Sequence, residues 1–423
     1  MSFQQGLSGL NASSKNLEVI GNNVANANTY GSKSARAEFA DMYASALNGA
    51  GTNNIGIGVN LAAVSQQFTQ GNISTTDNPM DIAINGGGFF QVSDGKSAPL
   101  YTRNGQFKVD KDGYLVNNQK QKLIGYSADA QGVIQPGASG PLLLPTAGIK
   151  PSATSKIRVE MNLDSRSATT LPATGPQIDL GDATTYNNAT SLTAYDAKGQ
   201  DVALTYYFQK AGTDSWNVYV AANGKSVLDN GATPAVPTPV TTIQFPANGG
   251  TPTLPAGPVS FDIPATTNAV GAATLPIAGV ALNLSGATQY GSSFAVTNLS
   301  QNGFAPGQLT SVNIEADGIL MARYSNGQSN PAGQIELATF RNPQGLMPQG
   351  GNAWAGSYSS GTPVVGVPGD GNLGVLQSGA LEESNVDLTG ELVNMITAQR
   401  VYQANAQTIK TQDQVMQTLV NLR

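Results

Sequence analysis

The sequence predicts a multidomain α+β fold: paired terminal α-helices, coiled-coil-like, with nested, mainly β domains between them that are formed from discontinuous segments. Proline is confined to the interior, from Pro79 to Pro368, so both ends of the 423-residue chain lack the strongest helix breaker. Both ends carry apolar residues at helical spacing, whereas the interior carries short alternating runs bounded by turn residues. This length is sufficient for several domains with cores of their own.

The N-terminal segment is predicted to be an amphipathic helix. Its apolar residues fall within an arc of about 140° at 100° per residue. They are Phe3, Leu7, Leu10, Leu17, Ile20 and Val24. Gly6, Gly9 and Gly21 each weaken the helix by roughly 1 kcal/mol relative to alanine, so we expect the segment to become ordered by packing against a partner.

The C-terminal segment repeats this pattern over a greater length. A heptad-like apolar seam consists of Leu388, Leu392, Met395, Tyr402, Ala406, Ile409, Met416 and Val420. Acidic residues lie just before this helix and in its first turn, and we interpret them as complementing the helix dipole. They are Glu382, Glu383, Asp387 and Glu391. A helix from Leu388 to Leu422 would span roughly 50 Å, which leaves little core within the chain to cover it.

Two interpretations of the ends are open. Each helix could pack separately on a core, as most amphipathic helices do, or the helices could pair with each other and with neighbouring subunits. The second interpretation is favoured by the length of the C-terminal helix. It predicts that the apolar residues of both helices form an assembly interface.

If the ends pair, everything between them is inserted sequence. The domains nearer the ends must then each be built from two separated segments. The predicted division is 1–30 with 380–423 as a helical assembly domain, 31–70 with 363–379 as a connector, 71–145 with 286–362 as a β domain, and 146–285 as an inserted outer β domain.

The outer domain is predicted to contain a β-meander. Its strands fall at 192–195, 202–208 and 216–220, and nine prolines between Pro234 and Pro276 restrict that stretch to loops and short edge strands. The aromatic residues of the meander could form a glycan-binding face or alternate into a core, and a core is favoured. They are Tyr206, Tyr207, Phe208, Trp216 and Tyr219.

Composition argues against several classes of function. The chain has no cysteine and no histidine, which removes disulfides, thiolate chemistry, the commonest general base and the commonest metal ligand. We therefore expect no enzyme activity, no catalytic residue, no cofactor and no metal. The net charge of -6, with 21 basic and 27 acidic residues, argues against nucleic acid and anionic membranes as partners.

The sequence also predicts how the chain relates to membranes. No apolar run approaches the roughly 20 residues that a membrane span needs, so no membrane insertion is expected. The N-terminus lacks the basic start and continuous apolar core of a cleaved secretory signal. If the protein is exported, another route is implied.

Three ungapped strings carry a family resemblance. The segment 21–33 (GNNVANANTYGSK), the segment 81–90 (DIAINGGGFF), and 378–388 (SGALEESNVDL) running into 395–405 (MITAQRVYQAN) resemble the bacterial flagellar rod and hook protein family. The signature residues in the first string are Asn22, Asn23, Ala25, Asn26, Thr29 and Gly31.

The resemblance implies an extracellular structural subunit, exported through the flagellar type III apparatus without a cleaved signal. Subunits would stack into a hollow helical tube, with terminal helices inside and β domains outside. The expected partners are further copies, rod proteins, the hook cap and the hook–filament junction proteins. The insert at 146–285 favours a subunit of the hook, the flexible joint that transmits torque. A distal rod or other axial protein, and a secreted glycan-binding adhesin, remain alternatives.

Overall fold

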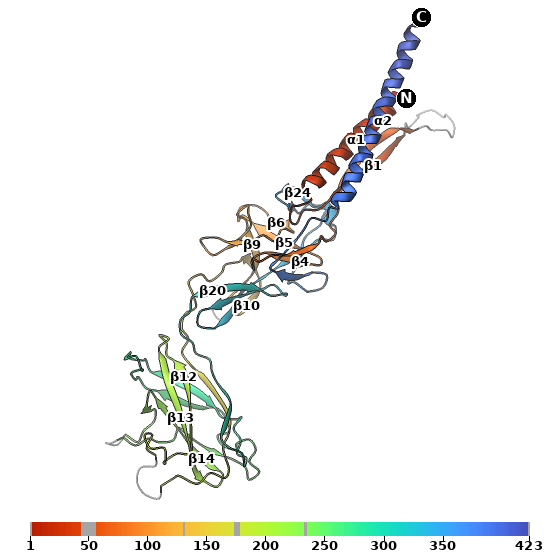
Figure 1. The fold of residues 1–423 in the computed structure, drawn as a ribbon. Helices are drawn as coiled ribbons and strands as arrows, with labels where there is room; N and C mark the ends of the chain where they lie inside the picture. The colour runs from red at the N-terminus through yellow and green to blue at the C-terminus, as the bar shows by residue number, and fades with distance from the viewer. Residues whose placement is uncertain (1, 44–55, 130–131, 173–177, 232–234, 422–423) are drawn as a thin grey trace. The chain divides into compact units, whose positions relative to one another are not determined.

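The computed structural model describes residues 2–43, 56–129, 132–172, 178–231 and 235–421 (Figure 1). The chain divides into two compact units, each described here by itself. Unit 1 comprises Met1–Thr146, Ser311–Arg323 and Ser329–Arg423, and unit 2 comprises Ala147–Thr310 with Tyr324–Gln328.

Unit 1 contains two long helices that come from opposite ends of the chain. Helix α1 (Ser2–Ala25) lies beside helix α2 (Leu388–Asn421) in the antiparallel direction (Figure 1). The hairpin of β1 (Ala35–Tyr43) and β2 (Gly56–Gln66) lies against α1, where the Gln5 amide donates to the Gly56 carbonyl at 2.6 Å. No helix in the described part of the chain is long and apolar enough to cross a membrane.

A large sheet forms the body of unit 1. Its main path runs β20–β21–β22–β9–β5–β6–β25–β24, while β10 and β8 join β9, β7 joins β8, and β26 joins β23 beside β5. The strands are β5 (Phe89–Ser93), β6 (Leu100–Thr102), β7 (Lys108–Val109), β8 (Leu115–Val116), β9 (Lys122–Ala128), β10 (Ile134–Pro141), β20 (Leu309–Ile314), β21 (Ile319–Tyr324), β22 (Ser329–Ile335), β23 (Leu337–Thr339), β24 (Met347–Gly350), β25 (Ala353–Ala355) and β26 (Val364–Gly366). A 3-10 turn (Pro343–Gly345) precedes β24.

Two short strand pairs join the beginning of this body to its end. Strand β4 (Ile82–Asn85) pairs with β27 (Val375–Ser378), and β3 (Ile73–Thr75) pairs with β28 (Ala380–Glu382). Ile82 and Ile84 on β4 are fully buried in the main core, and Ala83 between them is fully buried as well, so both faces of this strand are covered. Segments that lie about three hundred residues apart are thereby held side by side.

Unit 2 is formed by two sheets that enclose one core. One sheet has the order β17–β18–β11–β19, and the other has β12–β13–β14–β15 with β16 beside β14. The strands are β11 (Lys156–Asn162), β12 (Asn188–Tyr195), β13 (Asp201–Gly212), β14 (Ser215–Ala222), β15 (Lys225–Ser226), β16 (Thr241–Gln244), β17 (Val259–Ile263), β18 (Ile277–Asn283) and β19 (Ala295–Gln301).

Most aromatic residues of the predicted meander are buried, and Tyr206, Phe208 and Trp216 belong to this core. Tyr206, Phe208, Trp216 and Tyr219 are fully buried, and Trp216 donates its indole N–H to the Gln289 side chain at 2.9 Å. The fifth residue, Tyr207, is half-buried, and its ring packs edge-on against Tyr186. The core interpretation is therefore confirmed for four of the five aromatic residues, and these four cannot form a glycan-binding face.

Candidate assembly site

The signature residues end α1 and turn the chain into β1. Asn23 is buried and exchanges two hydrogen bonds with the backbone of Ala35, at 2.7 and 2.8 Å, and it donates to the Glu391 carboxylate of α2 at 3.0 Å. Asn26 donates to the Asn22 carbonyl at 2.9 Å. Asn23 therefore ties the end of α1 both to the hairpin and to α2.

The rest of the signature forms the turn that follows. Thr29 closes this turn by accepting the Ser32 N–H, and Ala25 is exposed at the last helical position. Gly31 adopts φ 69° and donates its N–H to the Glu382 carbonyl at 2.8 Å. A Cβ at Gly31 would lie 2.4 Å from the Asn104 nitrogen, so this close approach of two backbones requires glycine.

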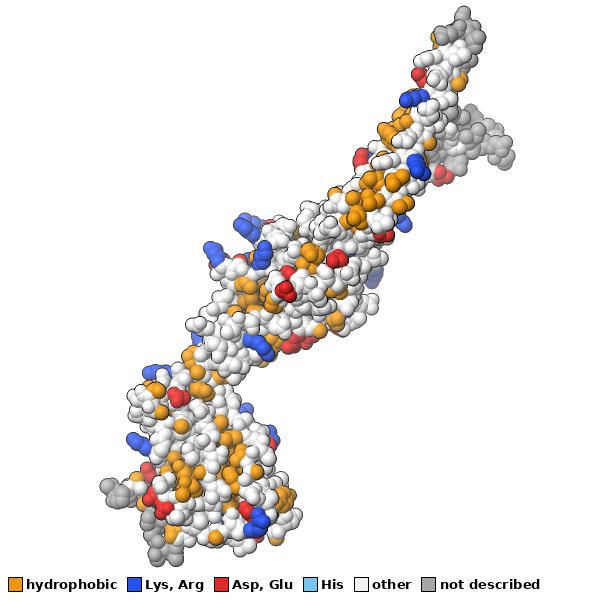
Figure 2. Space-filling view, in the orientation of Figure 1, with side chains coloured by type: hydrophobic (Ala, Val, Ile, Leu, Met, Phe, Trp, Pro, Cys, Tyr) orange, Lys and Arg blue, Asp and Glu red, His pale blue; other side chains and the backbone are white. Residues whose placement is uncertain are grey.

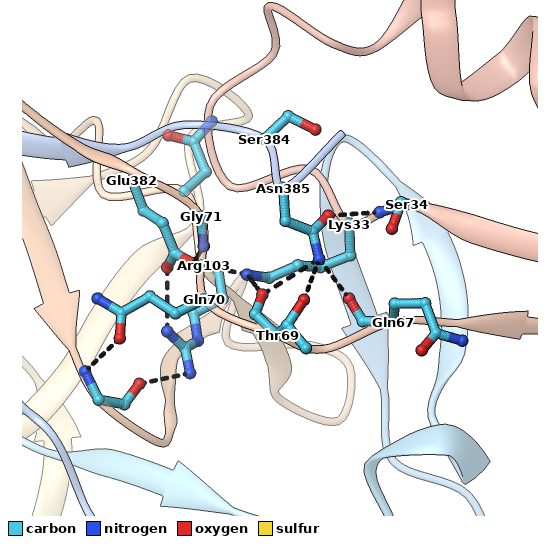
Figure 3. A network of polar contacts seen from close by, with 12 residues as sticks. Lys33, Ser34, Gln67, Thr69, Gln70, Gly71, Arg103, Glu382, Ser384 and Asn385 are labelled. Atoms are coloured by element: carbon cyan, nitrogen blue, oxygen red, sulfur yellow. Dashed lines mark hydrogen bonds and ion pairs between the residues drawn. The ribbon is translucent and has the colours of Figure 1, made fainter. Parts of the chain in front are cut away.

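A buried ionic network lies directly beyond this turn. The Glu382 carboxylate accepts from the Lys33 ammonium at 2.6 Å, from the Arg103 guanidinium at 3.0 Å and from the Gly71 N–H at 2.9 Å (Figure 3). The side chains of Lys33 and Glu382 are fully buried, and that of Arg103 nearly so. Burial lowers the pKa of the Lys33 ammonium, and the attraction of Glu382 opposes this shift.

Asn385 extends the network from the start of α2. Its amide donates to the Gln67 carbonyl at 2.8 Å and to the Thr69 side chain at 2.8 Å, while its oxygen accepts the Ser34 N–H at 2.7 Å (Figure 3). The Lys33 ammonium also donates to the Thr69 carbonyl, at 2.7 Å. The chain leaving α1 and the chain entering α2 are therefore fixed to the same short segment.

The contact between the two helices is made mainly by small and polar side chains. The side chain of Ile409 lies over Gly6, and that of Asn405 lies over Gly9, where an added Cβ would come within about 3 Å of it. Ala398 of α2 is buried at this contact. Removing side-chain bulk lets two helix backbones approach closely, which explains why glycines that weaken α1 are nevertheless present.

The predicted interface residues divide into two groups. Ile20 is buried, and Leu10, Leu17, Val24, Met395 and Ile409 are half-buried. The exposed residues are Phe3, Leu7, Leu388, Leu392, Tyr402, Met416 and Val420. Figure 2 shows hydrophobic side chains gathered on the surface of this helical end. The exposed group has no partner among the described residues that would bury it.

One interpretation of the acidic residues is wrong. Glu382 does not belong to the start of a helix, because it lies in β28 and is buried in the ionic network. Asp387 does cap α2, accepting the Thr389 N–H at 3.1 Å. Sequence reasoning also missed Lys33, Arg103 and Asn385. Lys33 and Asn385 lie within the signature strings, which was the available signal, whereas Arg103 lies outside them.

These groups offer structural rather than chemical function. The ammonium of Lys33 and both carboxylate oxygens of Glu382 have partners within the network. No group of three or more histidine, cysteine, aspartate or glutamate residues in the described ranges could hold a metal. The arrangement joins a pair of helices, with an exposed apolar surface, to a rigid β body, and it defines a subunit of an assembly.

Comparison with known proteins gives the class of that assembly. Residues 3–33 match the family described as flagella basal body rod protein, and residues 377–422 match the C-terminal domain of flagellar basal body rod FlgEFG protein. Residues 83–166 match the flagellar hook protein FlgE/F/G D1 domain, and residues 162–304 match the flagellar basal body protein FlaE D2 domain. The chain is therefore an axial protein of the bacterial flagellum.

Full-length relatives narrow the class to one family. The chain is 42% identical to flagellar hook protein FlgE of Salmonella typhimurium and 41% identical to that of Escherichia coli, in each case over 100% of both chains. The crystal structure of Helicobacter pylori flagellar hook protein FlgE2 covers 73% of this chain and 99% of its own, with a TM-score of 0.53 at 14% identity, and shares the fold. The chain belongs to the flagellar hook protein family, which confirms the predicted resemblance.

Proposed function

We propose that this chain polymerises into the flagellar hook, the flexible joint outside the cell, and that its two terminal helices act as one coiled-coil-like assembly element. The observation that carries the proposal is the exposed apolar surface on a helix pair whose own contact is already complete. Leu392 is 45% exposed on α2, and Phe3 is 49% exposed on α1. Other exposed apolar residues of the two helices add to this surface, namely Leu7, Leu388, Tyr402, Met416 and Val420. Apolar side chains gathered on one element mark an interaction site.

The buried network supports the proposal by holding this element on the β body. A load on the helix pair passes to the body through hydrogen bonds and ion pairs from Lys33, Arg103 and Asn385. A joint that transmits torque needs such a connection at the base of each assembly element. The remaining partners we propose, on membership of the family, are the rod, the hook cap, the hook–filament junction proteins and the type III export apparatus, with export that involves no cleaved signal.

Substitution of an exposed seam residue tests the proposal. We expect Leu392→Asp to abolish hook formation in cells in which this chain is the sole hook subunit, because the charge would have to be desolvated at a subunit contact. Thr408→Asp, on the same helix, is the matched control, since Thr408 is exposed and its side chain donates to the Ala404 carbonyl of its own helix. Hooks of normal number and length with Leu392→Asp would contradict the proposed interface.

A further inference from the structure

A groove of about 690 Å³ opens between the helix pair and the β1–β2 hairpin; its surface is mainly apolar, although Arg36 and Glu391 also line it. Its apolar lining includes Ala12 and Ile20 of α1, Val59 of β2, and Ala398 and Val401 of α2. Val401 is 47% exposed, so the groove retains uncovered apolar surface within the described subunit. Small side chains along both helices leave the groove open rather than filled.

The far end of α2 has the opposite character. Gly6 of α1 faces Ile409 of α2, and α1 begins only four residues before Gly6, so the antiparallel pairing ends near Asp413. Helix α2 continues to Asn421, which is about 12 Å further at 1.5 Å per residue. We call residues 414–421 the overhang; it extends past α1 in Figure 1.

The overhang carries exposed apolar side chains and no charge. Met416 is 56% exposed and Val420 is 72% exposed, and Val415 is also exposed. No residue in 414–421 is acidic or basic. Helix propensity alone leaves such a terminal stretch marginal in water, so it gains order when its apolar face is covered.

The overhang cannot fill the groove of its own chain. The groove is lined by α2 residues from Glu391 to Asn405, whereas the overhang begins nine residues after Asn405 and runs along the helix axis away from them. The occupant must therefore come from another molecule. If the chain polymerises as proposed above, the overhang of a second copy supplies uncharged apolar side chains to this groove.

We propose that the overhang of one subunit docks in the groove of the next. The two surfaces differ, so the contact is heterologous: each subunit donates one overhang and accepts another. A heterologous contact that does not close on itself generates an open helical polymer. This inference rests on the proposed hook function and specifies which surfaces meet.

Cysteine cross-linking tests the contact, because the chain contains no cysteine of its own. The test variant carries Met416→Cys and Val401→Cys. These positions are fifteen residues apart on one helix, a distance of about 22 Å, so the two cysteines cannot form a disulfide within one chain. The matched control carries Met416→Cys and Val393→Cys. Val393 is also a valine of α2, is 58% exposed and does not line the groove.

Each variant is produced as the sole hook subunit, the hooks are isolated and oxidised, and the subunits are separated without reductant. We expect the test variant to give a ladder of covalent multimers, because each subunit is joined at both ends. The control and each single-cysteine variant should give no ladder. Hooks of the test variant that yield only monomers, or a ladder of equal extent from the control, would overturn the inference and leave the hook function standing.

A charge-complementation pair covers the case in which the test variant forms no hooks. We expect Met416→Asp alone and Val401→Lys alone to abolish hooks, and co-production of the two chains to restore them, because each overhang that carries the aspartate can enter a groove that carries the lysine. Failure of the mixture would also overturn the inference. Failure of the unsubstituted chain to form hooks would instead contradict the proposed function.

Discussion

The Glu382 carboxylate lies 2.6 Å from the Lys33 ammonium, although 349 residues separate them in the sequence. Both side chains are fully buried, so each charge depends on the other for the solvation that water no longer provides. We expect Glu382→Gln to lower the free energy of unfolding of unit 1 by about 3–5 kcal/mol, because it leaves two cations buried without their anion.

Urea unfolding followed by tryptophan fluorescence in a Trp216→Phe background measures this loss, since the remaining Trp354 lies in the core of unit 1. Glu383→Gln is the control, because Glu383 is half-buried and its side chain makes a long hydrogen bond, at 3.3 Å, to Asn72. Equal stability of the two variants would mean that the buried network contributes nothing specific.

The turn at Gly31 should tolerate no side chain. Gly31→Ala places a Cβ 2.4 Å from the Asn104 nitrogen and in a left-handed conformation, so we expect a loss of at least about 2 kcal/mol in the stability of unit 1. Gly95→Ala is the control, because Gly95 also has a positive φ, 75°, but an added Cβ there would meet no atom within 4 Å. This variant should lose only about 1 kcal/mol of stability. Thermal unfolding measures the stability of both variants. Similar losses would show that the positive φ explains the effect and that the close contact with Asn104 does not.

The glycines of α1 should respond in opposite directions. Gly9→Val brings a branched side chain against Asn405, so we expect the helices to separate and their backbone amides to exchange with solvent faster. Gly21→Ala meets no atom within 4 Å and should stabilise α1 by about 1 kcal/mol. Hydrogen exchange of α1 and α2 is the measurement. Protection unchanged by Gly9→Val would argue that close approach of the helices is unimportant.

A buried carboxyl in the sheet should make stability depend on pH. Glu336 is fully buried, accepts one hydrogen bond from Ser139, and has a second carboxyl oxygen without a partner among the described residues. Burial raises its pKa above the ordinary value of 4.5, although the Ser139 hydrogen bond opposes the shift. The folded chain therefore binds this proton more tightly than the unfolded chain does.

It follows that the contribution of Glu336 to stability is present below about pH 4.5 and is lost as pH rises through the raised pKa. Near pH 7 we expect Glu336→Gln to have a higher free energy of unfolding than the unsubstituted chain, by about 1.4 kcal/mol for each unit by which the pKa is raised, and so to unfold at a higher urea concentration. Near pH 4 the two chains should have nearly the same free energy of unfolding. A difference in urea midpoint between the two chains that stays constant from pH 4 to pH 7 would contradict the role given to Glu336.

The parts of the fold that follow from local pattern could be predicted from the sequence. Helix α1 begins and ends within the predicted segment, and the predicted meander strands lie within β12, β13 and β14. Tyr206 and Phe208 of β13 alternate into the core, as a period of two requires. In each case the signal lies within the segment itself and needs no contact with a distant part of the chain.

The assembly site could be predicted only in outline. Apolar periodicity located α1 and α2, but it could not indicate which apolar residues face each other and which stay exposed, because Gly6, Gly9 and Ala398 at the contact carry no periodic signal. Glu382 was misassigned for a related reason. Its proximity to α2 in sequence suggested a dipole role, whereas its partners Lys33 and Arg103 are distant in sequence and only the fold brings them together.

The sequence separation of Lys33 and Glu382 also bears on when the subunit can mature. Lys33 precedes Glu382 by 349 residues in the order of synthesis, so a growing chain holds an unmatched lysine while the ribosome makes the segment between them. Closing so long a loop carries a large entropic penalty and is slow compared with forming local hairpins. The base of the helix pair therefore cannot close on a partial chain, and the completed subunit acquires its assembly element among its last steps of folding.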